Sequence, residues 1–436
     1  MASKRERRLQ KVQKAAYRYT PPGELKALAG SKDSRVLLMV ALNPSTPGSV
    51  LTKLAGHNNS EIRRMVAGNC SAPASVLARL ASDLDLGVRC EAAQNSSTPA
   101  KVLSKLSWSE ERQVLEAVAS NQSLPVGGLS RLAENALVMV RKMVAENPSA
   151  PEAVLSRLAK DAAEEVREAV VSNPALPGPD LVGLAKDGSR YIRSCVAEHP
   201  RVPEAVLMDL VADSDDSVRY LAAKNPKVPV ERLRVLAQSP DLDVVCGAAG
   251  NPRLPSADLS KLALNRDLYV RSAVADNHNT DPADLAALAL DAEHDVRSSV
   301  ADNRHTPVSA LLGLAYDVDD LVRDTAVANP NLSVEALAEL ANDPDFVVRC
   351  QVAMFPKTTA EVVRKLADDP VPAVRASAAL SRHIPPKVLE RLAQDPDPAV
   401  QSSVAGNPRT PPTALEHLLR TAQGETWSTA SRRLRA

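Results

Sequence analysis

The sequence is poor in aromatic residues and in cysteine. Aromatic side chains make up 2% of the 436 residues while 44% are hydrophobic, so a core must consist of leucine, valine and alanine. Such a core favours small, closely packed helices over a sandwich or a barrel. The five cysteines (70, 90, 195, 246 and 350) are far apart and form no CxxC pair, which argues against a zinc or iron–sulfur site and against a disulfide framework. We therefore expect no cofactor and no bound metal.

Long apolar runs, net charge and catalytic motifs are also missing. No 18 consecutive residues are apolar, and the start, MASKRERRLQKVQKAAYRYT, has no apolar segment of the kind found in signal peptides, so we expect a cytoplasmic protein that does not cross a membrane. Lysine plus arginine equals aspartate plus glutamate at 53 each, so the global charge indicates neither nucleic acid nor an anionic membrane as partner. No Walker loop, HExxH, nucleophile elbow or dinucleotide fingerprint is present. The sequence therefore predicts that the protein is not an enzyme.

What the sequence does contain is a repeat with a period of 26 residues. An asparagine, in most units followed by proline, recurs at positions 43, 69, 95, 121, 147, 173, 225, 251, 277, 303, 329 and 407. Tyr17, His199, Phe355 and Ser381 fill the missing phases, which gives 16 units without an insertion or deletion. We expect three segments: a basic N-terminal arm (1–16), a repeat solenoid (17–420), and a C-terminal cap with a basic tail (421–436) in which Trp427 covers the apolar end.

Each unit carries two apolar stripes with helical spacing. With the asparagine as position 1, position 9 is leucine in all units but one and position 12 is leucine in all 16. Position 20 is valine or isoleucine, and position 24 valine or alanine, in 15 units. Offsets of three and four residues are typical of helices and not of strands. The pattern predicts a helix A over about positions 5 to 14 and a second helix, helix B, in the rest of the unit.

Proline and aspartate mark the expected helix ends. Position 5 is proline in 13 units, as in Pro151, which suits the first turn of helix A. Position 15 is aspartate in nine units, as in Asp161 and Asp343, and we interpret it as the N-cap from which helix B starts. The proline at position 2 disfavours helical geometry for the asparagine before it, so helix B should end there.

A two-helix unit of this size cannot bury its own apolar face, so successive units must stack on one continuous core. The sequence predicts an all-α fold, an α-α superhelix (right-handed solenoid) of about 16 tandem 26-residue two-helix repeats. The unit NPSAPEAVLSRLAKDAAEEVREAVVS (147–172) resembles the bacterial leucine-rich repeat variant (LRV) family, and segments such as DPDFVVRCQVA (343–353) resemble helix B of HEAT repeats. The resemblance covers about residues 17–420. The founding member of that family carries an N-terminal iron–sulfur cysteine cluster, but residues 1–69 contain no cysteine, so that cofactor is not expected.

Position 21 is arginine in 11 units, between the apolar positions 20 and 24. These residues are Arg63, Arg89, Arg141, Arg167, Arg193, Arg219, Arg271, Arg297, Arg323, Arg349 and Arg375. They could form a basic stripe along a phosphate backbone. An unpaired charge beside two apolar positions would be costly, so we favour a structural ladder that pairs them with the aspartates of position 15 within and between units. The asparagine column has two similar interpretations, contact with an extended peptide or satisfaction of helix ends, and we favour the second.

The remaining candidates lie on the variable surface of helix B, at positions 18, 19, 22 and 26. Tyr191 and Tyr269 (position 19) and Tyr220 (position 22) could anchor a partner, or could be ordinary surface side chains. Residues 276–347 contain 15 acidic and 3 basic residues, which could recognise a basic partner or simply be solvated. The closest histidines, His278, His294 and His305, occupy unrelated positions, so no metal site is expected.

Together these patterns predict a non-catalytic repeat scaffold that presents an extended surface for protein–protein interaction. A basic protein partner could contact the acidic 276–347 region. The alternative is nucleic-acid binding along a HEAT-like groove with the basic N-terminal arm, against which the acidic region argues. A HEAT-like base-excision enzyme or lyase is a third hypothesis, which the scarcity of aromatic residues disfavours.

Overall fold

Pairs of short helices follow one another along the whole described chain. The computed structural model describes the backbone of residues 4–434 and the side chains from residue 8 onward, and within this range it contains 33 helices and no strand. The predicted all-α fold of tandem 26-residue, two-helix repeats is confirmed, whereas the right-handedness of the superhelix stays a prediction. The chain divides into two compact units, Met1–Val218 and Arg219–Ala436, and each is described by itself.

The even-numbered helices are helix A of the successive repeats, and all except the last are seven residues long. Their bounds are α2 (Pro22–Leu28), α4 (Gly48–Leu54), α6 (Ala74–Leu80), α8 (Ala100–Leu106), α10 (Val126–Leu132), α12 (Glu152–Leu158), α14 (Gly178–Leu184), α16 (Glu204–Leu210), α18 (Val230–Leu236), α20 (Ser256–Leu262), α22 (Pro282–Leu288), α24 (Val308–Leu314), α26 (Val334–Leu340), α28 (Ala360–Leu366), α30 (Pro386–Leu392) and α32 (Pro412–Thr421).

The odd-numbered helices are helix B, and most are nine residues long. Their bounds are α1 (Lys4–Ala16), α3 (Ser34–Leu42), α5 (Ser60–Gly68), α7 (Leu86–Gln94), α9 (Arg112–Ala119), α11 (Val138–Glu146), α13 (Glu164–Val171), α15 (Arg190–Glu198), α17 (Asp216–Lys224), α19 (Leu242–Ala249), α21 (Leu268–Asp276), α23 (His294–Asp302), α25 (Asp320–Ala328), α27 (Phe346–Met354), α29 (Pro372–Leu380), α31 (Pro398–Gly406) and α33 (Gly424–Leu434).

Helix A begins one residue later than predicted, because position 5 is its N-cap and not part of its first turn. The carbonyl oxygen of Pro151 accepts the backbone N–H groups of Val154 and Leu155, and α12 starts at the next residue. In the three repeats without proline, position 5 is a residue with a capping side chain. These residues are Asp281, Ser333 and Thr359, and each side-chain oxygen accepts a hydrogen bond from a backbone N–H group in the first turn.

The predicted start of helix B at position 15 is wrong by about two residues. Helix B begins at position 18, and its N-cap is position 17; for example, Asp267 caps α21 by accepting from the N–H groups of Tyr269 and Val270. The aspartate at position 15 precedes the helix and closes a turn instead, since Asp291 accepts a hydrogen bond from the Glu293 N–H group at 3.0 Å. Its other contacts are made with the preceding repeat, as described below. The predicted end of helix B at the asparagine is correct, because Asn69 is the C-cap of α5 with an extended ψ of 124°.

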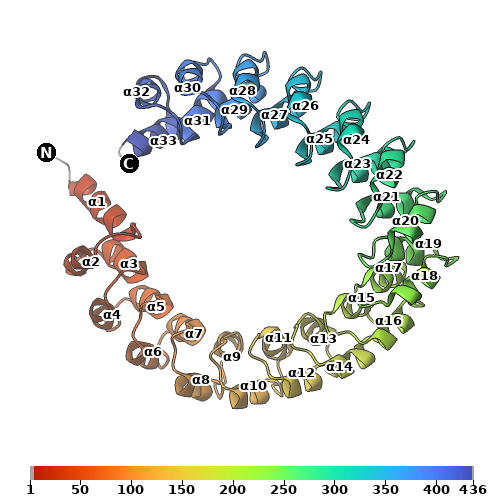
Figure 1. Cartoon of the computed structure of the whole chain (residues 1–436). Coiled ribbons are helices and arrows are strands. Elements are labelled where there is room, and N and C mark those ends of the chain that lie inside the picture. Colours follow the sequence, from red (N-terminus) through yellow and green to blue (C-terminus); the bar gives the residue numbers. More distant parts are fainter. Residues whose placement is uncertain (1–3, 435–436) are drawn as a thin grey trace. The chain divides into compact units, whose positions relative to one another are not determined.

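In each of the two compact units, the core is a single strip of leucine, valine and alanine side chains that runs through successive repeats. The side chains of positions 9, 20 and 24 are buried in nearly every repeat, as in Leu155, Val166 and Val170. In each unit taken by itself the odd-numbered helices form the concave layer and the even-numbered helices the convex layer (Figure 1). Small residues at position 25, such as Ala67 and Ala93, are fully buried and allow neighbouring odd-numbered helices to pack closely.

A buried asparagine joins each repeat to the one before it. The Asn69 Nδ2 group donates to the carbonyl oxygens of Ala41 (2.6 Å) and Asn43 (2.9 Å) in the preceding repeat, and its Oδ1 accepts from the Ser71 N–H group (2.8 Å). The same three bonds recur at most of the other asparagines, including Asn147 and Asn407. The carboxamide thus satisfies the carbonyl end of one helix and the turn that follows the next.

The residues that replace this asparagine differ in how many of its hydrogen bonds they retain. His199 keeps both parts, because its Nε2 lies 3.2 Å from the Asn173 carbonyl oxygen and its Nδ1 accepts from the Arg201 N–H group. Ser381 keeps only the acceptor, which receives a long hydrogen bond of 3.4 Å from the His383 N–H group. Phe355 has neither a donor nor an acceptor in its side chain. The junctions between repeats therefore differ in strength along the chain.

Both ends continue the repeat. Residues 4–16 of the predicted basic arm form helix α1, which packs on α3, and Asn43 donates to the Ala15 carbonyl oxygen as it would to an internal repeat; the side chains of Lys4, Arg5 and Arg7 lie outside the described residues. At the other end α33 buries Thr426 and Ala430 at positions 20 and 24. Trp427, expected to cover the apolar end, is instead 46% exposed. Arg433 takes the next asparagine position and donates to the Ala405 and Asn407 carbonyl oxygens.

The asparagine column can be tested with Asn69→Ala and Asn69→His. Alanine removes the hydrogen bonds to the Ala41 carbonyl oxygen and from the Ser71 N–H group, and it leaves the Asn43 carbonyl oxygen with only the Thr46 N–H group. This loss should lower the free energy of unfolding by about 2 kcal/mol. Histidine can make the contacts seen at His199 and should cost less than half as much. Urea denaturation followed by circular dichroism measures both, and equal losses for the two variants would contradict the proposed role of the carboxamide.

Candidate partner-binding surface

The concave layer exposes one stripe of each odd-numbered helix. Positions 20, 24 and 25 point into the core, while positions 19, 22, 23 and 26 lie on the other side with helical spacing. Side chains of neighbouring helices meet along this stripe, since the hydroxyls of Ser272 and Ser299 are 2.8 Å apart. The stripe contains the three tyrosines proposed from the sequence, whereas the eleven arginines lie at its edge and are mostly covered.

Each of the eleven arginines forms an ion pair with the repeat that follows it. In nine repeats the partner is the aspartate of position 15, twenty residues later, and in eight of these the Nε–Oδ2 distance is 2.6–2.7 Å. The pairs are Arg63–Asp83, Arg141–Asp161, Arg167–Asp187, Arg193–Asp213, Arg271–Asp291, Arg297–Asp317, Arg323–Asp343, Arg349–Asp369 and Arg375–Asp395. We call this set, with the two pairs below, the arginine ladder.

The guanidinium groups of the ladder use most of their donors inside the protein. Arg271 binds Asp291 through Nε and Nη2, and its Nη1 donates to the carbonyl oxygens of Asn265 and Arg266 in its own repeat. A two-point contact of this kind is the strongest arrangement available to arginine and carboxylate. Only 15% of the Arg271 side chain and 10% of the Asp291 side chain are exposed. The ladder therefore offers no row of free cations to a phosphate backbone.

Six junctions between repeats depart from the pairing of arginine with an aspartate at position 15. Arg89 and Arg219 face a serine at position 15, and their carboxylate partners are at position 17, Glu111 and Asp241. The four repeats without arginine are followed by a position 15 without aspartate. These neutral pairs are Leu37 with His57, Leu115 with Asn135, Val245 with Asn265, and Gln401 with Thr421.

The ladder changes the titration of its carboxylates. The hydrogen bond from Arg271 lowers the pKa of Asp291 below its ordinary value, although partial burial acts in the opposite direction. The same cause lowers the pKa of Asp83, Asp161 and Asp395. A lowered pKa means that the folded chain favours the charged carboxylate.

The structure brings two of the three proposed tyrosines together. Tyr220 and Tyr269 line one pocket of about 300 Å³ on the concave layer between α17, α19 and α21, which we call the tyrosine pocket. Tyr269 is 68% exposed. Tyr191 belongs to the other unit and lies against Cys195, a contact that raises the pKa of its hydroxyl. The two units provide different surroundings for tyrosines that share position 19.

The tyrosine pocket also contains charged residues that we did not select from the sequence. Lys224 donates to the Tyr220 hydroxyl (2.9 Å), and its Nζ is 5.2 Å from the centre of that ring. Asp276 remains accessible, but neighbouring side chains displace water from its carboxylate, and this desolvation raises its pKa. Helical spacing could have found both residues, because Lys224 is four residues after Tyr220 and Asp276 is seven after Tyr269.

Carboxylates continue from the tyrosine pocket along the concave layer. Asp276 and Asp302 occupy position 26 of neighbouring helices, Asp295 occupies position 19 and Asp324 position 22. Of these four, only Asp295 has a basic side chain within ion-pair distance among the described residues, the adjacent His294 at 3.5 Å. We call Asp276, Asp295, Asp302 and Asp324 the acidic row. Part of the acidic region predicted from the sequence is thus concentrated on α21, α23 and α25.

The same region exposes apolar side chains at the turns between helices A and B. Leu264 and Leu290 occupy position 14 in two successive repeats and are each 86% exposed, and Tyr316 follows at position 14 of the next repeat. Leu290, Tyr316 and Val318 line an open pocket of about 650 Å³. The predictions from the sequence missed this row because they treated position 14 only as the end of a helix.

Within residues 4–434 no group of three histidine, cysteine or acidic side chains is arranged to hold a metal ion. Of the histidines considered from the sequence, His278 and His305 lie side by side with ring centres 6.1 Å apart. No helix in that range combines the length and the apolar character needed to span a bilayer.

Comparison with solved structures finds similar repeat proteins. A leucine-rich repeat variant, described as having a novel repetitive structural motif, matches with 27% identity over 51% of this chain and 87% of that chain, at a TM-score of 0.35. An engineered protein matches with 21% identity over 94% and 97% of the two chains (TM-score 0.19), and importin beta with 13% identity over 98% and 68% (TM-score 0.29). No protein-family model and no curated protein matches the chain. The repeat pattern of this chain resembles the family to which the first of these structures, the leucine-rich repeat variant, is assigned by its description.

A native neutral pair provides a sharp test of the ladder. Arg271→Val leaves the largely buried Asp291 carboxylate without its partner and should lower the free energy of unfolding by about 3 kcal/mol. The double variant Arg271→Val/Asp291→Asn reproduces the pair Val245 and Asn265 and should recover most of that loss. Chemical denaturation of the two single variants and the double variant measures the coupling. Additive losses would show that the two side chains do not act as a pair.

The lowered aspartate pKa values also predict a pH dependence. Because the pKa of Asp291 is lower in the folded chain than in the unfolded chain, its stabilisation is complete above the ordinary value of about 4 and is lost as the pH falls through the folded value. The denaturation midpoint of the wild type should therefore fall more steeply below about pH 4 than that of Arg271→Val/Asp291→Asn. Midpoints measured between pH 7 and pH 2 test this, and parallel curves would refute it.

Proposed function

We propose that this protein is a non-catalytic repeat scaffold whose concave layer in the second unit binds a basic segment of a protein partner. The observation that supports this function most directly is the tyrosine pocket at the start of the acidic row. The Tyr220 ring already has Lys224 as its neighbour. The Tyr269 ring beside the accessible Asp276 carboxylate can hold an arginine or lysine side chain through cation–π and ionic contacts. The exposed ring of Tyr269 makes no cation or ring contact among the described residues.

The charges of the acidic row favour an extended basic segment over a single cation. The raised pKa of Asp276 arises first from desolvation, and the nearby Asp302 carboxylate adds to it. A cation placed between these carboxylates would relieve both effects. The row follows three neighbouring helices, so a segment lying across them could place successive basic side chains against it. Steering by the surrounding negative charge would increase the rate of association.

A protein partner agrees better with these contacts than a nucleic acid does. The arginines that could have followed a phosphate backbone bind carboxylates of the next repeat. The exposed charges of residues 276–347 are predominantly negative, which repels phosphate groups.

The test uses a fluorescent peptide of alternating arginine and serine, with a glutamate–serine peptide as the charge control. We expect saturable binding of the basic peptide to the full chain by anisotropy. The variants Tyr269→Ala and Asp276→Asn/Asp302→Asn should each weaken it about tenfold, equivalent to about 1.4 kcal/mol. Binding should also weaken as salt is added, because the contacts are ionic.

Two matched substitutions make the result specific. Tyr191→Ala removes a tyrosine from the same repeat position in the other unit, and Glu335→Gln removes an acidic side chain from α26 in the convex layer. Neither should change the affinity. Equal losses in these controls, equal binding of the acidic peptide, or tighter binding of single-stranded DNA would each overturn the proposal.

A further inference from the structure

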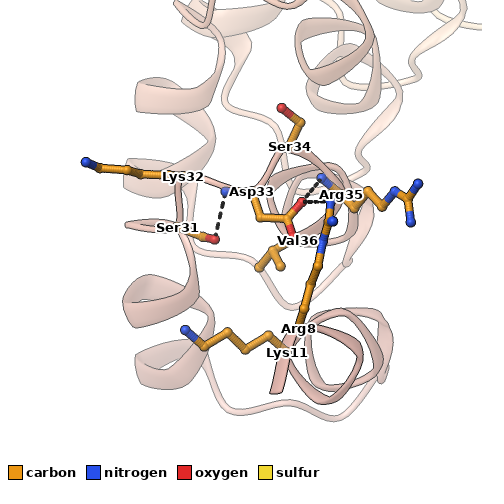
Figure 2. Close-up of a pocket in the computed structure, with 8 residues that line it drawn as sticks. All are labelled: Arg8, Lys11, Ser31, Lys32, Asp33, Ser34, Arg35 and Val36. Atoms are coloured by element: carbon orange, nitrogen blue, oxygen red, sulfur yellow. Dashed lines mark hydrogen bonds and ion pairs between the residues drawn. The ribbon is translucent and has the colours of Figure 1, made fainter. Parts of the chain in front are cut away.

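The first junction of the stack contains a pocket whose lining is mostly basic. Arg8 and Lys11 on α1 face the turn before α3, and together with that turn they line an open pocket of about 1,020 Å³ (Figure 2). Its lining consists of Arg8, Lys11, Ser31, Lys32, Asp33, Ser34, Arg35 and Val36. Four of these side chains are cationic and one is anionic, so the lining carries a net charge of +3. We call this the N-terminal pocket.

The register of the repeat shows why the pocket has excess positive charge. Lys11 lies 26 residues before Leu37 and so occupies the position of a ladder arginine, but position 15 of the next repeat is Ser31 and not aspartate. The serine hydroxyl accepts a hydrogen bond from the Asp33 N–H group. Lys11 therefore faces no carboxylate at the place where other repeats provide one.

The single carboxylate of the pocket is already engaged. Arg8 pairs with Asp33 and donates from Nη2 to Oδ1 at 3.0 Å, and the Arg35 N–H group donates to the same oxygen at 3.1 Å. The contact with Arg8 lowers the pKa of Asp33, so the carboxylate stays charged. Figure 2 shows these bonds at Asp33, with the ammonium groups of Lys11 and Lys32 ending away from it. Among the side chains that the structure describes, Lys11, Lys32 and Arg35 form no ion pair.

We propose that the N-terminal pocket binds a small polyphosphate, in the free inorganic form or as part of a nucleotide. Lys11, Lys32 and Arg35 are exposed and extend in different directions, with Lys32 and Arg35 on opposite sides of Asp33 (Figure 2). These long side chains can turn toward one bound anion and neutralise several of its phosphate oxygens, and two serine hydroxyls line the same pocket. The volume is that of a small-molecule site and exceeds the needs of one phosphate group.

The lining also limits what is recognised. Val36 is the only apolar side chain in it, and no aromatic residue is present to stack on a base. The contacts are therefore to the phosphate groups, and inorganic triphosphate should bind about as tightly as ATP. A long nucleic acid would need basic charge that continues along the stack. In the following repeats of this unit the ladder arginines are paired with carboxylates, so that continuation is missing.

The experiment measures binding of inorganic triphosphate, ATP, inorganic phosphate and a 20-nucleotide single strand to the full chain by isothermal titration calorimetry. We expect saturable binding of both triphosphates and weaker binding of inorganic phosphate. Lys11→Ala, Lys32→Ala and Arg35→Ala should each reduce the triphosphate affinity about tenfold. All three side chains are exposed, so the variants should fold, and thermal denaturation without ligand checks this.

A charge-matched control separates a site from general attraction. Lys26→Ala removes a lysine from α2 that does not line the pocket, and it should leave the affinity unchanged. The proposal is overturned if no triphosphate binding is measurable at physiological salt, if Lys26→Ala weakens binding as much as Lys11→Ala does, or if the single strand binds more tightly than triphosphate. None of these variants alters the acidic row, so failure here is independent of the function proposed above.

Discussion

The bond between an asparagine side chain and the preceding repeat is the contact on which the stack depends. Within each 26-residue repeat one helix ends and the next begins within a few residues. At every junction this leaves backbone carbonyl and N–H groups that are buried from water. One carboxamide has both the donors and the acceptor that these groups need. That explains why the asparagine is buried and why His199, which offers similar atoms, is the polar replacement that keeps both contacts.

The ladder adds a second constraint, which concerns charge. A cation buried beside positions 20 and 24 needs a carboxylate opposite it, and each of the eleven ladder arginines has one, whereas Leu37, Leu115, Val245 and Gln401 occur without one. Lys11, at the same position before the first repeat, has Ser31 opposite it and is exposed. Removing one partner of a buried pair would cost several kilocalories per mole. The ladder residues therefore stabilise the junctions between repeats.

The repeat made most of the fold predictable, because 16 copies average out the ambiguity of any one. The two helices of each repeat, the core positions and the end of helix B followed from periodicity and proline. Helix α1 (Lys4–Ala16) was not predicted, because it precedes the first repeat that the asparagine phase marks. The start of helix B did not, because Asp291 and its equivalents bind the preceding arginine and the turn, and an N-cap has the same residue preference as such a turn. The tyrosine pocket could be predicted only in part. Helical spacing places Lys224 near Tyr220. The approach of Tyr220 to Tyr269 depends on how their helices pack, which the spacing does not show.

Leaving out the ladder residues shows which charged side chains are available on the surface. Three of the 15 acidic residues in 276–347 and two of its three basic residues belong to the ladder, so twelve acidic residues and one basic residue remain for the surface. At the N-terminal pocket the imbalance is the opposite, because four cationic side chains share one carboxylate and Ser31 replaces the aspartate that would face Lys11. Neither imbalance is visible in a net charge of zero. In a repeat protein, the residues that differ from the consensus determine what the surface can bind, because the consensus residues pack and connect the repeats.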